Sequence, residues 1–149
     1  MSISTYPNYM DGPGKAGQLS NYQDYVADTE VAEEVIHYGH AVQLNATGTA
    51  VTNVKTGGSV IGVAMLREGH DFVEKKDDYK YEVGDPLAVV KRGRLFVVAG
   101  GDVLKGQAVK VDPTTQKFVA DGAGAVDVKA VFKGPAVADQ LVEIEIHLP

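Results

Sequence analysis

The sequence predicts an all-β fold, a small β-sandwich or barrel of jelly-roll-like or β-tulip-like form that follows an extended N-terminal arm. Three observations predict it. Apolar and polar residues alternate with period two from residue 29 onward, with turn signals roughly every 8–12 residues. Glycine is abundant, at 17 of 149 residues, which suits tight turns. No window of about 11 residues or more carries a helical stripe of apolar positions.

Length and composition narrow the class further. A chain of 149 residues fits one domain of ordinary size. Cysteine is absent, which excludes disulfides and thiolate metal sites. The net charge of -6 gives no electrostatic attraction to nucleic acid. No apolar run approaches the roughly 18–20 residues of a membrane helix, and the N-terminus lacks the features of a signal peptide. We therefore expect neither nucleic acid nor membrane among its partners.

The first 30 residues differ from the rest, and we expect residues 1–30 to form the extended N-terminal arm and residues 31–149 a single β-domain. Up to Asp28 the chain is rich in proline and glycine and nearly free of aliphatic residues, so it buries too little apolar area to order itself. Four of the seven tyrosines lie here, and amphipathic rings favour interfaces. These predicted binding residues are Tyr6, Tyr9, Tyr22 and Tyr25.

In the first half of the domain, short strands are expected at residues 31–37, 39–44 and 59–65. The first of these could instead begin a short helix, although the β-branched residues favour a strand. Turns are predicted at Asn45–Gly48 and Lys55–Gly58, where glycine can supply a positive φ. The charged segment that follows, residues 68–80, is predicted to be a surface loop, with Phe72–Val73 as one short strand within it.

The second half of the domain shows the clearest hairpin signal. Two apolar runs, Leu87–Val90 and Leu95–Val98, flank Lys91–Arg94, which we interpret as the hairpin turn. A second hairpin is predicted from Val109–Val111 and Lys117–Val119.

The Asp112–Thr115 segment suits the type I turn that joins this second hairpin. Strands are further expected at Val126–Phe132 and Leu141–Leu148. In the last strand, alternation places Val142, Ile144, Ile146 and Leu148 on the inward face.

A glycine followed by a strand recurs as one device. The pattern glycine, any residue, alanine or proline, aliphatic, any residue, aliphatic begins at Gly39, Gly84 and Gly106. Because the spacings differ, the pattern does not indicate a solenoid. We predict three structural turn glycines, each turning the chain into a strand whose aliphatic side chains face the core.

Candidate catalytic and metal-binding residues are few in this sequence. His37 and His40 are three residues apart, a spacing that places them on opposite faces of a strand, so they should not hold one ion. Glu143 and Glu145 share a strand face at a separation that overlaps that of a glycosidase pair, but neighbouring carboxylates on a polar face are usually solvated. Nucleophile elbows, phosphate loops and calcium loops are missing from the sequence. We expect no catalytic residues, metal or cofactor.

The sequence resembles the capsid cement, or decoration, proteins of tailed bacteriophages. The likeness covers roughly residues 30–149 and rests on Gly39-x-Ala-Val, Gly62-Val-Ala, Val83-Gly-Asp-Pro, Gly93 and Lys105-Gly-Gln-Ala-Val-Lys-Val, behind an arm rich in proline, glycine and tyrosine. These motifs are structural turns and not a catalytic signature.

The resemblance implies a structural protein that binds the outer surface of a phage capsid and stabilises contacts between major capsid subunits. It implies the major capsid protein as partner, a homo-oligomer with the trimer favoured over the dimer, and location on the virion after synthesis in the host cytoplasm. It also implies an arm that orders on the capsid by adding a strand.

Two other functions are compatible with the residues. A carbohydrate-binding or adhesin-like β-module would need a planar row of exposed aromatic rings, for which Tyr38, Tyr79 and Tyr81 are the candidates in the domain. A small β-barrel hydrolase would be built around Glu143 and Glu145. A glycan array and a double glutamine variant respectively discriminate these two functions from the cement protein.

Overall fold

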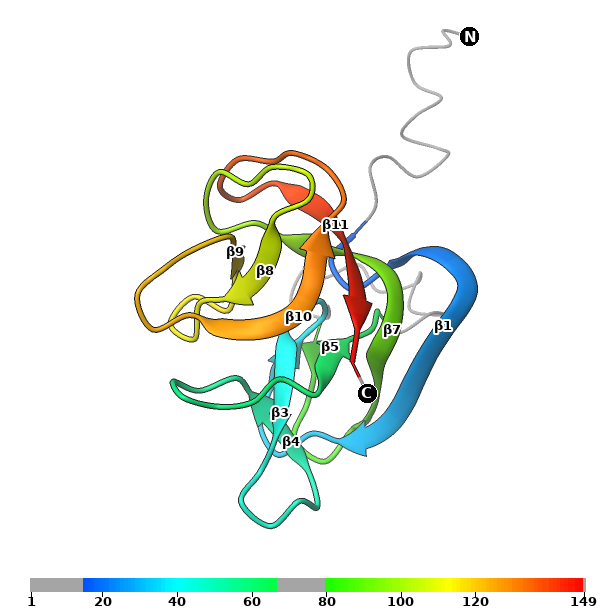
Figure 1. Ribbon diagram of the computed structural model, residues 1–149. Coiled ribbons are helices and arrows are strands. Elements are labelled where there is room, and N and C mark those ends of the chain that lie inside the picture. The colour runs from blue at the N-terminus through cyan, green and yellow to red at the C-terminus, as the bar shows by residue number, and fades with distance from the viewer. Residues whose placement is uncertain (1–14, 67–79, 149) are drawn as a thin grey trace, which may run out of the picture.

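The computed structural model describes residues 15–66 and 80–148, with the backbone alone for residues 21–23. Strands and turns make up these ranges, and none of their residues is helical (Figure 1). The all-β prediction is therefore confirmed. In the part of the chain so described, no helix is long and apolar enough to cross a membrane. The strands are β1 Leu19–Val31, β2 Ile36–His37, β3 Ala41–Leu44, β4 Val51–Asn53, β5 Gly62–Ala64, β6 Lys80–Tyr81, β7 Pro86–Val98, β8 Ala108–Val111, β9 Phe118–Val119, β10 Val126–Phe132 and β11 Leu141–His147.

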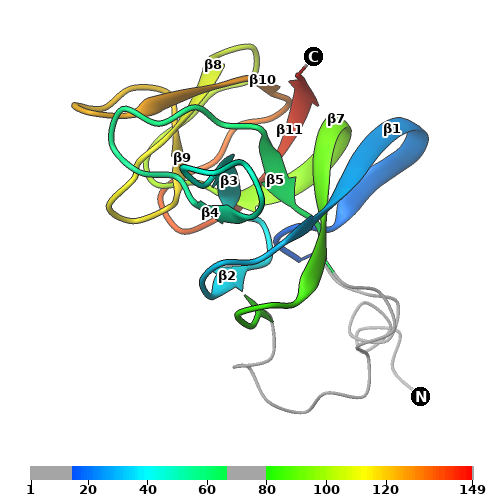
Figure 2. The ribbon, with the colours of Figure 1, turned by 90° about the horizontal axis from the view of Figure 1, so that it is seen from below.

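Strand β7 organises one curled antiparallel sheet of nine strands, in the order β4-β3-β5-β7-β11-β10-β8-β9 with β1 also on β7. On one edge of β7, β5 pairs at Val89–Val90 and β11 pairs from Arg92 to Val98. On the other edge, β1 pairs along almost the full length of β7. The sheet therefore divides beyond β7 into one part with β5, β3 and β4 and another with β11, β10, β8 and β9 (Figure 2).

The hairpin predicted across residues 87–98 is wrong. Lys91–Arg94 is not a turn, because Arg92 is paired with Val26 on one side and with His147 on the other. The two apolar runs thus form one strand of 13 residues, β7. Tertiary pairing on both edges outweighs the local turn signal, and Gly93 marks a bend with close backbone approach.

Most of the other predicted elements are confirmed. β8 and β9 form the second hairpin, with Lys110 opposite Val119, and β3 and β4 form a hairpin closed by the Asn45–Gly48 turn. β10 spans the predicted residues Val126–Phe132. The four residues predicted to face inward are buried, three in β11 and Leu148 directly after it. The helical alternative for residues 31–37 is wrong, since Ile36–His37 is strand β2.

The segment expected at 59–65 is shorter, with only Gly62–Ala64 as strand β5. Residues 67–79 lie outside the described residues, so the surface loop and the short strand at Phe72–Val73 stay predictions.

The expected N-terminal arm extends into the sheet. Residues 19–31 are strand β1, which is antiparallel to β7 from Leu19 opposite Leu95 to Val31 opposite Pro86. Leu19 is only 4% exposed and belongs to the core. Since β1 is extended but lies on the chain's own β7, only residues 1–14 of the arm fall outside the described ranges.

The core has two clusters of buried side chains, and the larger extends across both parts of the divided sheet. The larger packs the inward faces of β10 and β11 around Phe118 and Phe132. The smaller gathers around Ile36, Val42 and Leu87 beneath β3 and the start of β7. No charged or polar residue among those described is buried, so aliphatic packing and backbone hydrogen bonds stabilise the fold.

Candidate functional site

The carboxylate pair considered for hydrolysis lies on a strand face with cationic neighbours. Glu145 is on β11, with its carboxylate 3.3 Å from Lys133 Nζ and 3.8 Å from Arg94. Glu143 is half-buried on the same strand, and no ion pair joins it to another described residue. Ion-paired carboxylates on an exposed face are ordinary surface features, so this arrangement offers no general acid beside a general base.

The expectation that His37 and His40 lie apart is wrong. His37 ends β2, the chain turns at Tyr38–Gly39, and the two imidazole rings meet with centroids 5.3 Å apart. His40 Nδ1 lies 3.0 Å from Asn53 Oδ1, and Asn53 Nδ2 donates to the carbonyl of Val35. The Asn53 oxygen therefore accepts from His40, which places the imidazole proton on Nδ1.

The same contacts make this histidine pair structural. Burial lowers the pKa of His40 from 6.5, the hydrogen bond to Asn53 raises it, and the neighbouring His37 lowers it. Asn53 lies in β4, so a neutral His40 ties the β2–β3 turn to that strand. No group of three or more metal-ligating side chains occurs within residues 15–66 and 80–148.

The four tyrosines predicted to bind a partner fall in three places. Tyr6 and Tyr9 lie outside the described residues, and Tyr22 is in β1 with only its backbone described. Tyr25 is 40% exposed on β1, at a bulge where residues 22–25 lie opposite Gly93 alone. Their role in binding stays a prediction.

The root of the N-terminal arm is fixed to the body by a turn at Lys15–Gln18, the anchor turn. Gly17 N donates to Phe96 O over 2.8 Å, and Leu66 N donates to Gly17 O over 2.8 Å. Phe96 N also donates to Gln18 O. These bonds join the turn to β7 and to Leu66, two residues after β5, so the chain is held to the body from Gly17 onward.

The anchor turn is one copy of a recurring four-residue turn. In each copy the N–H of the fourth residue donates to the carbonyl of the first, and the third residue has a positive φ. In four copies, those whose third residue is Gly17, Gly84, Gly106 or Asp139, the side-chain oxygen of the fourth residue also accepts from the N–H of the first. The third residues are Gly17, Gly39, Gly57, Gly84, Gly106, Gly124 and Asp139. The predicted turn residues Gly39, Gly84 and Gly106 occupy equivalent positions in this device.

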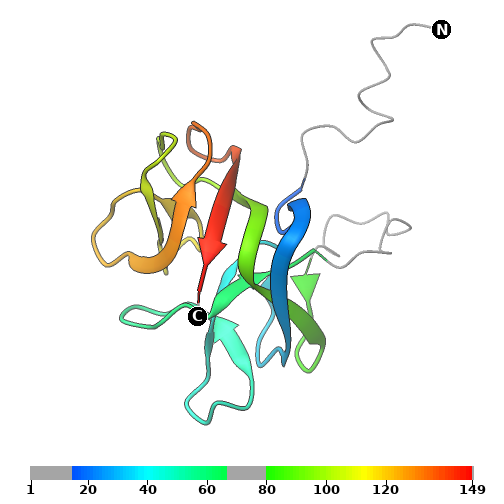
Figure 3. The ribbon, with the colours of Figure 1, turned by 45° about the vertical axis from the view of Figure 1, so that its right-hand side comes forward.

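The longest open strand edge belongs to β1. Among the described residues it pairs with β7 alone, and its other edge faces away from the sheet (Figure 3). Tyr25, Val26 and Val31 are exposed apolar side chains on this strand. Unpaired N–H and C=O groups beside exposed apolar side chains form a template for another extended chain.

Two of the three tyrosines that a carbohydrate platform would use are buried. Tyr38 is 4% exposed and Tyr81 is 2% exposed, and their rings meet edge to face with centroids 5.1 Å apart. Tyr81 Oη donates to the carbonyl of Met65 over 2.6 Å. Since Tyr79 lies outside the described residues, the described part of the domain presents no planar row of exposed rings built from these residues.

Comparison with known proteins gives a family and a fold. The model of the family described as structural cement protein (E217 gp24/Pam3 gp6) matches residues 3–147. A comparison with curated proteins found no match.

Among solved structures, a chain from the capsid of Myoviridae phage XM1 superposes with a TM-score of 0.73 at 15% identity, over 89% of this chain and 89% of that chain. The N base of head fiber gp8.5 of bacteriophage phi29 superposes with a TM-score of 0.54 at 16% identity, over 82% of this chain and 93% of that chain. At these identities the two likenesses show the fold.

Proposed function

Because this chain belongs to the structural cement protein family of phages, we propose that it binds the outer surface of a capsid and stabilises contacts between major capsid subunits. The observation that carries the proposal is the family match over residues 3–147, which takes in both the N-terminal arm and the β-domain. A structural role is consistent with ion-paired Glu145 and with a histidine pair that serves packing.

The open edge of β1 supports binding by strand addition. β1 runs beside the ten residues Pro86–Leu95 of β7, so at about 3.3 Å per residue its edge is about 30 Å long. An extended capsid segment that adds to this edge would gain main-chain hydrogen bonds without requiring a particular sequence. Tyr25, Val26 and Val31 would supply apolar contact beside those bonds.

The anchor turn supports the proposal that the residues before it hold the protein to the capsid. Residues 1–14 carry Tyr6 and Tyr9, which we propose contact the capsid. A force on these residues is transmitted to the anchor turn, and from there through its hydrogen bonds to Phe96 in β7 and to Leu66, two residues after β5. The sheet thus resists a force applied through the arm, which a protein that holds capsid subunits together requires.

We further propose that the protein acts as a homo-oligomer, with a trimer favoured over a dimer. Copies joined in one unit bind a symmetric shell with avidity, because each bound copy raises the effective concentration of the next. Sedimentation equilibrium of the full chain measures the mass directly.

Heads of the parent phage assembled without this protein test the function. We expect the purified full chain to bind these heads from outside, to appear by cryo-electron microscopy over contacts between major capsid subunits, and to raise the temperature at which the heads rupture. An unrelated acidic protein of similar size serves as control. The proposal fails if the heads take up no more of this chain than of the control.

A further inference from the structure

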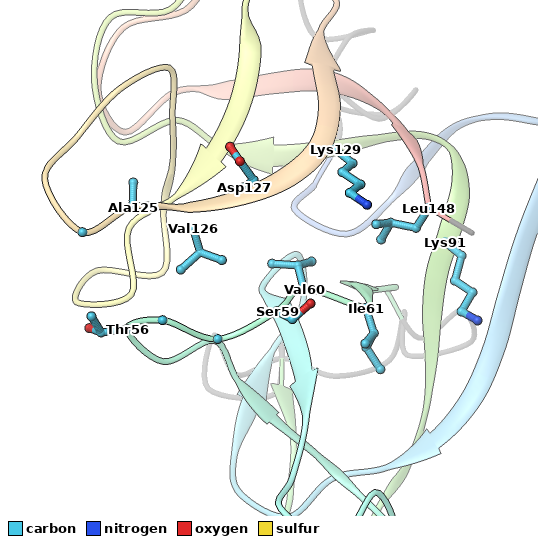
Figure 4. Close-up of a pocket in the computed structure, with 13 residues that line it drawn as sticks. Thr56, Ser59, Val60, Ile61, Lys91, Ala125, Val126, Asp127, Lys129 and Leu148 are labelled. Atoms are coloured by element: carbon cyan, nitrogen blue, oxygen red, sulfur yellow. The ribbon is translucent and has the colours of Figure 1, made fainter.

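A cleft opens where the two parts of the sheet diverge beyond β7 (Figure 4). One wall is residues 56–61, between β4 and β5, and the other is residues 124–129, which lead into and include the first half of β10. Lys91 and Leu148 lie at the end where the walls meet. The cleft has a volume of about 670 Å³, which is within the range of ligand sites in proteins.

Both walls present backbone without strand partners. β11 pairs with β10 only at Ala130–Phe132, so residues 126–129 have no strand partner on that edge. Across the cleft, the backbone groups of Ser59 and Val60 make no backbone hydrogen bond to another described residue. Two facing stretches of open backbone fit one extended peptide.

The cleft combines an apolar lining with a free cation, Lys129, while the carboxylate of Asp127 on the same wall points away from that amino group (Figure 4). Val60, Val126 and Leu148 line it with side chains that are buried or half-buried. Lys91 already pairs with Asp28, at 2.7 Å, whereas Lys129 forms no ion pair with any described residue. Figure 4 shows the amino group of Lys129 directed toward Leu148 inside the cleft.

Lys129 also has an unusual backbone. Its φ is 58°, in the left-handed region that lysine seldom adopts, and it lies in a bulge between the Asp127–Lys110 and Val131–Ala108 pairs. Glycine would form the same bulge without strain. Strained residues held by the surrounding structure are concentrated at functional sites.

We propose that this cleft binds an extended segment of a capsid protein that carries an aspartate or glutamate, whose carboxylate pairs with Lys129. This inference rests on the proposed function and adds a second contact, distinct from the edge of β1. The peptide backbone bonds to the open edges at residues 59–60 and 126–129, and its apolar side chains cover Val60 and Leu148.

Lys129 favours a capsid segment over the chain's own first residues. Residues 1–14 contain a single acidic residue, Asp11, so they offer little to a free lysine. A capsid segment with a carboxylate supplies the missing counter-ion. The two occupants are separated below by identifying what is cross-linked to the cleft.

A glycine substitution separates the charge of Lys129 from its backbone. The full-length Lys129→Gly variant should unfold at a higher temperature, because glycine relieves the positive φ, yet bind cement-free heads at least tenfold more weakly. The matched control is Lys105→Ala, which removes an exposed charge outside the cleft and should change binding less than twofold.

The outcomes distinguish the two proposals. If the wild-type chain does not bind heads, the proposed function fails. If it binds and Lys129→Gly binds equally tightly, the function stands and the cleft inference is overturned.

A unique thiol identifies the occupant. The chain has no cysteine, so Ser59→Cys carries the only one and can be labelled with a photoreactive maleimide. On cement-free heads we expect a cross-link to a capsid peptide that contains aspartate or glutamate. A cross-link to residues 1–14 or another part of this chain, or no cross-link on heads that have bound the labelled protein, overturns the inference.

Discussion

Gly93 lies directly beneath Tyr25, so closely that a Cβ built on Gly93 would be 2.9 Å from the Cβ of Tyr25. The contact occurs at the β1 bulge, where Asn21 pairs with Arg94 and Val26 with Arg92. Gly93 has a φ of 131°, which L side chains rarely adopt. The missing side chain at residue 93 thus allows β1 to follow the bend of β7.

Gly93→Ala should therefore destabilise the protein. An alanine there combines the cost of a positive φ, about 1–2 kcal/mol, with a steric clash that adds about 1–3 kcal/mol. We expect a loss of about 2–4 kcal/mol in the free energy of unfolding, measured by urea denaturation. Gly101→Ala is the control, since nothing lies within 4 Å of its added Cβ and its φ is not positive. Equal losses in the two variants would contradict this account of Gly93.

The sequence did not reveal the role of Gly93 because a glycine between two basic residues and two apolar runs is typical of a hairpin turn. Whether such a glycine turns or bends the chain depends on strand partners far away in sequence. Here Val26 and His147 both pair with Arg92 and hold β7 extended. By contrast, the alternation in β11 is a local signal of burial, and it predicted the inward face of that strand.

The residue at which the folded body begins was also not evident from the sequence, for a related reason. β1 is joined to β7 mainly by backbone hydrogen bonds, which need no aliphatic pattern, and few of the β1 side chains that the structure describes are buried. The turn at Gly17 matches those at Gly84 and Gly106, but in the sequence it stands among prolines and glycines typical of a tail. The equivalent turn at Asp139 was not predicted, because its third residue is aspartate and not glycine.

Two truncations locate the boundary. Deleting residues 1–14 should leave the unfolding temperature within about 2 °C of wild type, because the anchor turn and β1 remain. Deleting residues 1–30 removes Leu19 and almost all of β1, exposes one edge of β7, and should yield an insoluble or strongly destabilised protein. Calorimetry of both proteins measures this difference. A stable, monodisperse product lacking residues 1–30 would contradict the assignment of β1 to the body.

The turn glycines should differ in how much stability is lost when each is replaced by alanine. At Gly84 and Gly106 an added Cβ meets nothing within 4 Å, so alanine costs only the positive φ, about 1–2 kcal/mol. At Gly39 the Cβ would also lie 2.8 Å from Ala16 Cβ, against the anchor turn, so Gly39→Ala should cost more than either. Gly134→Ala, with open space and no positive φ, should cost less than about 0.5 kcal/mol. Denaturant midpoints rank the four variants. A Gly39→Ala variant that loses no more free energy of unfolding than Gly106→Ala would contradict this ranking.

Stability should fall in mildly acidic solution through His40. Burial lowers the pKa of His40 below 6.5, so the unfolded chain takes up this proton more readily than the folded one. The contribution of neutral His40 is complete above pH 6.5 and is lost as the pH falls below 6.5 toward the lowered pKa. His40→Gln, which can still donate to Asn53, should flatten the unfolding temperature between about pH 7.5 and 5.5. The same pH dependence in the wild type and the variant would assign the effect to other groups.

Removing the two tyrosines ahead of the anchor turn should weaken capsid binding without affecting the fold. Tyr6 and Tyr9 precede Gly17, where the backbone bonds to the body begin, so Tyr6→Ala/Tyr9→Ala should keep the wild-type unfolding temperature. Each aromatic anchor buried at an interface is worth about 1–2 kcal/mol or more, so the double variant should leave cement-free heads at least tenfold faster. The matched Tyr6→Phe/Tyr9→Phe variant keeps the rings and tests whether the hydroxyl groups contribute. If the alanine variant dissociates from the heads at the wild-type rate, these rings do not contribute to capsid binding, and the binding resides in the β-domain.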